Sequence, residues 1–167
     1  MLNKAIEIAA KAHNGQVDKG GNPYILHPLR VLLNFCESES EAVKICAVLH
    51  DVVEDTDVTL DDLRAEGFSG EVITALDCLT KREGESYDDF ISRILPNKIA
   101  CTVKHGDLTD NMDLTRILNP TEKDRERVIK YRDAANRIIS APLLSIVPIP
   151  NLQIDEVNIN FDMEIKE

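Results

Sequence analysis

The 167-residue chain contains no tryptophan, and only 4% of its residues are aromatic. We therefore expect a core built mainly from aliphatic side chains. Positive charge is also scarce, because 19 Lys and Arg residues face 30 Asp and Glu residues, which gives a net charge of -11. This acidic balance excludes nucleic-acid binding through a broad basic face. A phosphorylated ligand would need a local cluster of Lys and Arg, or a metal ion.

Long apolar runs are absent as well. No stretch approaches the roughly 20 residues that cross a bilayer, and the amphipathic N-terminus lacks the apolar core of a signal peptide. The four cysteines are scattered within apolar helical patterns, at Cys36, Cys46, Cys78 and Cys101. This scatter favours small core residues in a reducing compartment over disulfides or a zinc knuckle. We therefore expect a cytoplasmic protein that binds neither nucleic acid nor a membrane.

Helical patterns dominate the first 140 residues, and they predict an all-α body of about seven or eight helices. Several helix starts carry a hydroxyl residue followed three positions later by an acid, which is the capping-box pattern. These pairs are Ser38 with Glu41, Thr59 with Asp62, Ser86 with Asp89, and Thr121 with Asp124. A further helix is predicted to start at His27, with Pro28 at its first position. A Gly-rich loop, residues 15–24, precedes it.

The last 27 residues differ in character. Pro142, Pro148 and Pro150 break any helix, and residues 157–165 then alternate strictly between apolar and polar side chains. This alternation predicts a short β-strand with one buried face. We expect it to pair with residues 143–149, or with the same segment of a second chain in a homo-oligomer. The predicted division is a helical domain, 1–140, and a strand-forming tail, 141–167, which is an appendage or the start of a second domain.

The stretch VLHDVVEDTD, residues 48–57, places four ionisable groups inside an apolar run. His50 and Glu54 are four positions apart, as are Asp51 and Asp55, so each pair lies on one stripe of the predicted helix. A helix that is apolar on nearly all sides is buried, and buried carboxylates are unfavourable unless they are paired or bind a metal. No Lys or Arg lies within residues 45–63. A divalent cation is the simplest explanation; the alternative is that this end of the helix is exposed and its acids are solvated.

Two other segments offer possible metal ligands. His27 follows the Gly-rich loop, and VKHGDLTDNMD, residues 103–113, supplies Asp107 and several neighbouring polar groups. Taken alone, a histidine at this position is more often a packing or capping residue than a metal ligand. Taken alone, the 103–113 segment is explained by a solvated acidic face.

Three motifs together resemble the HD-superfamily hydrolase domain of RelA/SpoT-type enzymes. They are AHNGQVDKGGNPYILHPLRV at 12–31, VLHDVVEDT at 48–56 and VKHGDLTDNM at 103–112. The likeness extends over about residues 2–140 and is greatest to small single-domain alarmone hydrolases of the Mesh type. It implies an HD-domain helical bundle that hydrolyses the 3′-diphosphate of (p)ppGpp, a nucleotide of the stringent response, to pyrophosphate and GDP or GTP. The tail resembles the opening of a strand-rich bacterial domain of unknown function.

The resemblance also assigns roles to residues. The metal ligands of the family correspond to His27, His50, Asp51 and Asp107. Its catalytic acid pair corresponds to Glu54 and Asp55, which can orient water and transfer protons. The family usually binds manganese, and a site with two imidazoles and two carboxylates suits Mn²⁺ or Fe²⁺, although Zn²⁺ could bind by affinity alone. The substrate contacts that we predict are Asn111, which corresponds to a ribose-binding residue, and Lys19, Tyr24, Lys104 and Asp18.

The sequence departs from the family pattern at a few positions. Asp18 stands where the long enzymes have an arginine that packs on the purine, so it either contacts a base edge or caps the Gly-rich turn. Asp110 and His105 also replace the usual residues, and we predict that both are peripheral. Lys81 and Arg82 are further candidates for phosphate binding, but they also suit a helix C-terminus.

Two other functions fit the same motifs. One is a related nucleotide phosphatase acting on NADPH or a nucleoside monophosphate, because the sequence does not show the shape of the pocket. The other is a non-catalytic module that binds nucleotides or assembles through the tail. The presence of Glu54, Asp55 and all four ligand positions argues against the second alternative.

Overall fold

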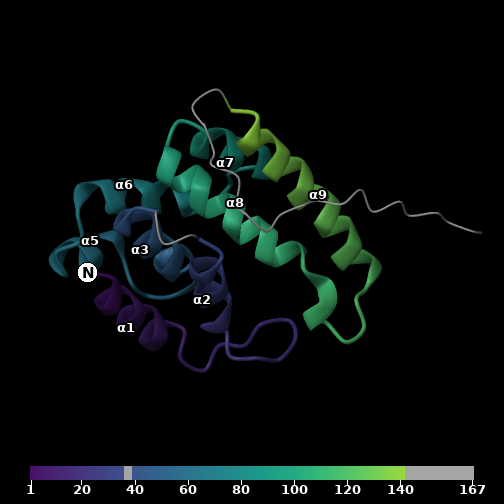
Figure 1. Cartoon of the computed structure of the whole chain (residues 1–167), viewed down its shortest axis with the longest axis horizontal. Coiled ribbons are helices and arrows are strands. Elements are labelled where there is room, and N and C mark those ends of the chain that lie inside the picture. Colours follow the sequence, from purple (N-terminus) through teal and green to yellow (C-terminus); the bar gives the residue numbers. More distant parts are fainter. Residues whose placement is uncertain (36–38, 142–167) are drawn as a thin grey trace, which may run out of the picture.

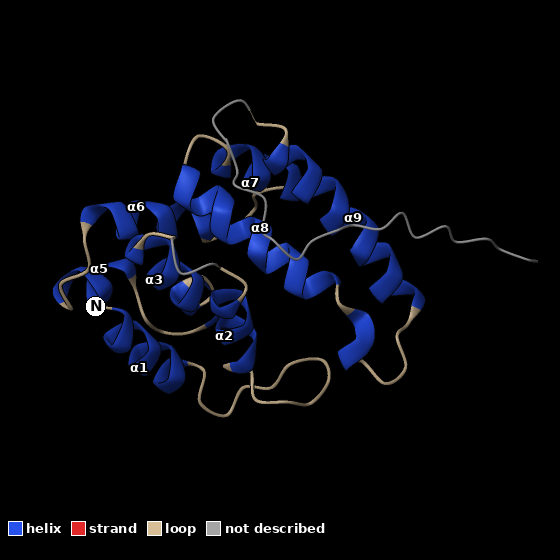
Figure 2. Ribbon diagram, in the orientation of Figure 1, coloured by secondary structure: helices blue, strands red, loops and turns tan. Residues whose placement is uncertain are grey.

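The computed structural model describes residues 1–35 and 39–141, and this part of the chain is helical (Figures 1 and 2). Its elements are α1 Leu2–Ala12, α2 Leu26–Leu33, α3 Glu41–Leu49, α4 Val52–Asp55, α5 Leu60–Ala65, α6 Gly70–Leu79, α7 Tyr87–Ile94, α8 Lys98–Met112, the 3₁₀ helix η1 Leu114–Arg116, and α9 Glu122–Ile139. The predicted all-α body is confirmed. The strand predicted at 157–165, its pairing and the domain boundary at 140 concern a tail that lies outside the described residues.

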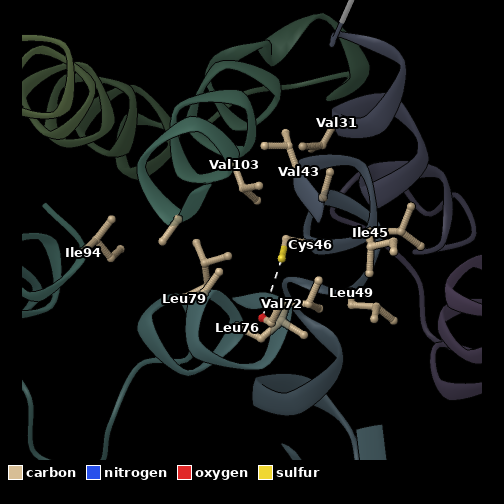
Figure 3. Packing of buried hydrophobic residues seen from close by; sticks show 14 of the residues in the cluster. Val31, Val43, Ile45, Cys46, Leu49, Val72, Leu76, Leu79, Ile94 and Val103 are labelled. Atoms are coloured by element: carbon tan, nitrogen blue, oxygen red, sulfur yellow. Dashed lines mark hydrogen bonds between the residues drawn. The ribbon is translucent and has the colours of Figure 1, made fainter. Parts of the chain in front are cut away.

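Helix α3 packs against α1, α2, α6 and α8, while α9 lies along α8 (Figure 1). The buried side chains around α3 are almost all aliphatic, as the composition predicts. Figure 3 shows Cys46 of α3 directed at α6, where its thiol lies 3.7 Å from the carbonyl oxygen of Val72. Cys46 and Cys101 are buried free thiols, and Cys78 is half-buried. Cys36 lies outside the described residues.

Most predicted helix ends agree with the structure. Thr59 with Asp62 forms a complete capping box on α5, and Thr121 with Asp124 forms one on α9. The box predicted from Ser38 and Glu41 is wrong, because the N-cap of α3 is Ser40, whose Oγ accepts a hydrogen bond from the backbone of Val43. None of the helices in the described ranges is long and apolar enough to cross a membrane.

The predicted central helix is interrupted at its most polar point. Helix α3 ends at Leu49, and α4 begins only at Val52. The ring of His50 donates from Nδ1 to the carbonyl oxygen of Ala47, at 2.8 Å, which is the acceptor that the N–H of residue 51 would use in a continuous helix. The expectation that this segment is buried all round is wrong for α4, since Glu54 and Asp55 are both exposed.

Arg93 of α7 forms an ion pair with Glu85, in the loop between α6 and α7, and this pair predicts how the stability of the fold depends on pH. Arg93 donates to both carboxylate oxygens of Glu85, at 2.7 and 2.9 Å, and to the carbonyl oxygen of Thr80. Hydrogen bonds from Arg93 and from the backbone of Arg82 lower the pKa of Glu85 from 4.5 to about 2. Because the folded-state pKa is depressed, the pair stabilises the fold fully above the unfolded value and loses that effect as pH falls from 4.5 to 2.

We therefore expect Glu85→Gln to be less stable than the wild type at pH 7. The difference in the free energy of unfolding between the two proteins should shrink as pH falls toward 2. Urea unfolding at a series of pH values measures this difference. A difference that stayed constant between pH 7 and pH 3 would show that the charge of Glu85 contributes nothing to stability.

Candidate metal centre and adjoining cavity

The four predicted metal ligands come from three places in the chain that the fold brings together. His27 lies in the first turn of α2, His50 and Asp51 lie in the break between α3 and α4, and Asp107 lies on α8. Helix α8 approaches α2 closely at Gly106, where a Cβ atom would lie 3.4 Å from Cγ1 of Val31 and 2.9 Å from Cζ of Phe35, just after α2. The absence of a side chain at Gly106 thus permits the close packing of the two helices, which places the carboxylate of Asp107 next to His27 and His50.

The ligand atoms converge on one point. His27 Nε2 lies 3.1 Å from Asp107 Oδ1 and 3.5 Å from Asp51 Oδ2. His50 Nε2 lies 3.1 Å from the same oxygen of Asp51 and 3.5 Å from that of Asp107. Ligand atoms of His27, His50 and Asp107 all lie within 4.8 Å of one another, so these three buried residues form a group that could hold a metal ion.

The hydrogen bonds of the two imidazoles suit a cation at this point. His27 Nδ1 lies 2.7 Å from Asp110 Oδ2, and His50 Nδ1 lies 2.8 Å from the carbonyl oxygen of Ala47. Each Nδ1 therefore donates a proton to an oxygen, which leaves Nε2 as the site of the lone pair. His50 Nε2 is buried and has no hydrogen-bond partner. A buried nitrogen lone pair facing two carboxylates is the arrangement expected of a metal ligand.

The electrostatics of the cluster favour positive charge. Burial alone lowers the pKa of His27, but hydrogen bonds to Asp107, Asp110 and Asp51 outweigh it and raise this pKa to about 11. Burial likewise opposes the shift at His50, where the charge of Asp51 and a contact with Asp107 raise the pKa to about 9. A metal ion would compete with these protons for the same nitrogens, so its binding would release protons.

Three of the predicted substrate contacts form hydrogen bonds or an ion pair with carboxylates of the cluster. Lys104 Nζ lies 2.6 Å from Asp107 Oδ2, and its side chain is only 14% exposed. Asn111 Nδ2 donates to Asp107 Oδ1, at 2.6 Å. Tyr24 donates its hydroxyl proton to Asp51 Oδ2, also at 2.6 Å. In this structure all three side chains therefore contact carboxylates of the predicted metal site.

The predicted catalytic acids lie on α4, one turn beyond His50 and Asp51. Glu54 Oε2 accepts a hydrogen bond from the backbone N–H of Lys81, at 2.9 Å. Partial burial, and then the negative charges of Asp51 and Glu54, raise the pKa of Asp55. The Lys81–Arg82 pair is thus near Glu54 through its backbone, whereas the guanidinium of Arg82 faces Asp77 at 3.5 Å.

A cavity of about 280 Å³ adjoins the cluster and reaches it through His27 and Tyr24. Its walls come from the Gly-rich loop, the end of α8, η1 and the start of α9, and they include the predicted residues Asp18, Lys19 and Asn111. Sequence reasoning missed the other polar and aromatic lining residues, which include Arg30, Arg116, Arg127 and Tyr131. Arg116, Arg127 and Tyr131 lie outside the three motifs, and Arg30 lies within the first motif without an assigned role. An arginine on an amphipathic helix gives no local signal of a cavity.

Each cation that lines this cavity, within the described ranges, faces a carboxylate. Lys19 Nζ lies 3.2 Å from Asp124 Oδ1, and Arg127 Nη1 lies 3.8 Å from the same oxygen. Arg30 and Arg116 both contact the carboxylate of Asp110. The cavity is therefore close to electrically balanced. Any phosphate that binds in it must compete with these acids for its cations.

The Gly-rich loop is organised by Asp18. Its Oδ1 accepts hydrogen bonds from the backbone N–H groups of Gly20 and Asn22, both at 2.9 Å. Gly20 in turn packs against η1, where a Cβ atom would lie 2.7 Å from the carbonyl oxygen of Arg116. Of the two roles considered for Asp18, the structure displays the turn-capping one. Asp110, which we predicted to be peripheral to the chemistry, contacts His27 directly.

The chain is similar to several known proteins. It is 30% identical over 152 residues to the guanosine-3′,5′-bis(diphosphate) 3′-pyrophosphohydrolase of Vibrio cholerae, which covers 82% of this chain and 21% of that protein. It is 32% identical over 136 residues to a probable GTP pyrophosphokinase of Mycobacterium leprae, which covers 75% of this chain and 17% of that protein. The chain thus spans only about a fifth of the length of these curated relatives.

Two further comparisons concern the fold and the tail. A solved structure described as "A metazoan ortholog of SpoT hydrolyzes ppGpp and plays a role in starvation responses" superposes with a TM-score of 0.71 at 22% identity, over 84% of this chain and 86% of that one. This likeness shows a shared fold. Residues 90–167 also match a family described as "Protein of unknown function (DUF2589)". That match begins within α7, well before the tail.

Proposed function

The chain is homologous to RelA/SpoT-type enzymes over most of its length, and from this premise we propose that it is a metal-dependent hydrolase of (p)ppGpp-type alarmone nucleotides. The reaction breaks the bond between phosphorus and the ribose 3′ oxygen and releases pyrophosphate and GDP or GTP. The observation that carries the proposal is the convergence of His27, His50, Asp51 and Asp107 beside a cavity. We also propose that residues 1–140 form the hydrolase domain and that 141–167 is a separate tail.

In this proposal His27 and His50 hold the metal through Nε2, and Asp51 and Asp107 hold it through carboxylate oxygens. Manganese is the expected ion, because two imidazoles and two carboxylates form a fairly hard site. When bound, the ion supplies a Lewis acid that activates water and stabilises charge on the phosphoryl group. Lys104 neutralises the second oxygen of Asp107, which reduces the repulsion between this site and an incoming phosphate.

In this proposal Glu54 and Asp55 carry out the proton transfers of the reaction. Asp55 has a raised pKa, and a carboxyl group whose pKa is closer to the working pH both accepts and returns a proton more readily. The backbone N–H of Lys81 donates to one oxygen of Glu54. This hydrogen bond restricts the rotamers of the carboxylate, so that its other oxygen can orient a water molecule. The cavity would hold the nucleoside, with Tyr131 and Arg127 offering flat surfaces to a base.

A nucleotide panel with Mn²⁺ tests the proposed reaction and also the choice of base. We expect ppGpp and ppApp to release pyrophosphate with kcat/KM values within about tenfold of each other, or roughly 1.4 kcal/mol. The reason is that Asp18 stands where relatives stack an arginine on the purine, and its Oδ1 is already engaged by the turn. Nothing at this position therefore distinguishes guanine from adenine.

The products separate the competing functions. Orthophosphate released from NADPH or GMP, with no pyrophosphate from ppGpp, would favour the phosphatase alternative. No turnover of any compound, with nucleotide still bound, would favour a non-catalytic module. A guanine preference of several hundredfold would leave the hydrolase standing but would show that another residue reads the base.

A further inference from the structure

We propose that Asp110 is a positioning residue of the metal centre, which acts through His27 and is itself fixed by Arg30 and Arg116. The inference rests on the proposed function, because it concerns the residues that hold the metal. Asp110 does not belong to the ligand set. Its side chain nevertheless joins a metal ligand to the wall of the cavity.

The contact with His27 defines what Asp110 can do. Asp110 is only 5% exposed, and its Oδ2 lies 2.7 Å from His27 Nδ1. A carboxylate at this distance accepts the Nδ1 proton, fixes the plane of the ring and leaves the Nε2 lone pair directed at Asp51 and Asp107. A carboxylate that accepts from a metal-binding imidazole also makes the imidazole a stronger ligand.

Arg30 holds the same carboxylate through a two-pronged contact. Its Nε donates to Oδ1 of Asp110, at 2.9 Å, and its Nη2 donates to Oδ2, at 3.1 Å. Arg30 follows His27 by three positions on α2, so both side chains lie on one helix face and meet α8 together. This fork sets the orientation of the carboxylate as well as its charge.

Arg116 completes the network from the cavity side. Its Nη2 lies 2.6 Å from the backbone oxygen of Asp110 and 3.1 Å from Oδ2, while its Nη1 lies 3.0 Å from Oδ2 of Asp113. The guanidinium groups of Arg30 and Arg116 therefore flank the carboxylate of Asp110. These contacts offset the charge of a buried carboxylate and fix its position against His27.

The experiment compares Asp110→Asn with Asp113→Asn in the full-length protein, by titrating each metal-free variant with Mn²⁺ in a calorimeter. Both changes remove one negative charge beside Arg116, but only Asp110 touches a metal ligand. We expect Asp110→Asn to weaken Mn²⁺ binding by about 10- to 100-fold, the usual effect of removing a partner of a metal ligand. Asp113→Asn should bind Mn²⁺ within about twofold of the wild type, because loss of a partly exposed charge has little effect at a distance.

Three results would overturn the inference. The first is wild-type Mn²⁺ affinity in Asp110→Asn, and the second is an equal loss in both variants, which would indicate a general effect of charge. If circular dichroism shows that Asp110→Asn does not fold, Arg30→Met is tested in its place, because it keeps the carboxylate of Asp110 and removes the two hydrogen bonds from Arg30. Unchanged Mn²⁺ affinity in Arg30→Met is the third result that would overturn the inference.

The behaviour of the wild-type protein distinguishes failure of the proposed function from failure of this inference. A wild-type protein that binds no Mn²⁺ and releases no pyrophosphate would reject the hydrolase itself, and the role of Asp110 with it. A wild-type protein that binds Mn²⁺ and hydrolyses ppGpp, beside an Asp110→Asn variant of equal affinity, would reject only the positioning role.

Discussion

Glu54→Gln and Asp55→Asn should each lower kcat for ppGpp by about 10²- to 10⁴-fold, the range that a general acid or base contributes. Glu54 is bonded to the backbone of Lys81, and we assign neither acid to the set of metal ligands, so Mn²⁺ binding should be retained. Both replacements nearly preserve the size of the side chain but remove its negative charge and its ability to accept and return a proton. The expected loss therefore appears in turnover and not in metal content.

Steady-state kinetics with ppGpp, together with metal analysis of the purified variants, measures both quantities. Asp57→Asn is the matched control, because Asp57 is an exposed acid two residues farther along the chain and has no assigned role. Its kcat should equal that of the wild type. Near wild-type turnover in both test variants would reject the roles given to Glu54 and Asp55.

His50→Ala should abolish Mn²⁺ binding and hydrolysis together. The change removes the one buried nitrogen of the cluster that has no hydrogen-bond partner and leaves Asp51 and Asp107 facing an empty space. Removing a partner of a metal ligand already weakens metal binding by 10- to 100-fold, so removing the ligand itself should exceed about 100-fold. The thermal stabilisation that Mn²⁺ gives the wild type should disappear as well.

His105→Ala separates this effect from a general loss of a buried histidine. His105 is also buried on α8, but it is not part of the cluster. Its variant should be less stable, yet it should bind Mn²⁺ as the wild type does. Full metal content and full activity in His50→Ala, measured by elemental analysis and pyrophosphate release, would show that the metal is held elsewhere.

Much of this architecture could be predicted from local patterns. The capping boxes at Thr59 and Thr121 predict where α5 and α9 begin, because the hydrogen bonds involved lie within four residues. The apolar run around His50 and Asp51 indicates burial, and burial of a carboxylate without a nearby cation indicates a partner from another segment. That His27 and Asp107 supply this partner was implied by the family resemblance, and the spacing within any single motif could not show it.

The features that escaped prediction depend on contacts between distant segments. The break after α3 depends on a side chain competing for a backbone acceptor, which no apolar periodicity reveals. The position of Lys104 against Asp107 follows the helical spacing, yet its burial depends on Phe90 and other residues of neighbouring helices. The partnership of Asp110 with Arg30 joins positions 80 residues apart. Each of these charges, taken alone in the sequence, is indistinguishable from a solvated surface charge.

The pairing of the cavity cations has a consequence for how a nucleotide arrives. Lys19, Arg30, Arg116 and Arg127 each face an acid, so the cavity projects little positive field into the solvent, while the whole chain carries a net charge of -11. An anionic nucleotide is therefore not steered from a distance, and attraction begins only within about one Debye length, roughly 8 Å at physiological salt. Dissolved salt, by screening the repulsion of the acidic body, would ease the encounter instead of slowing it.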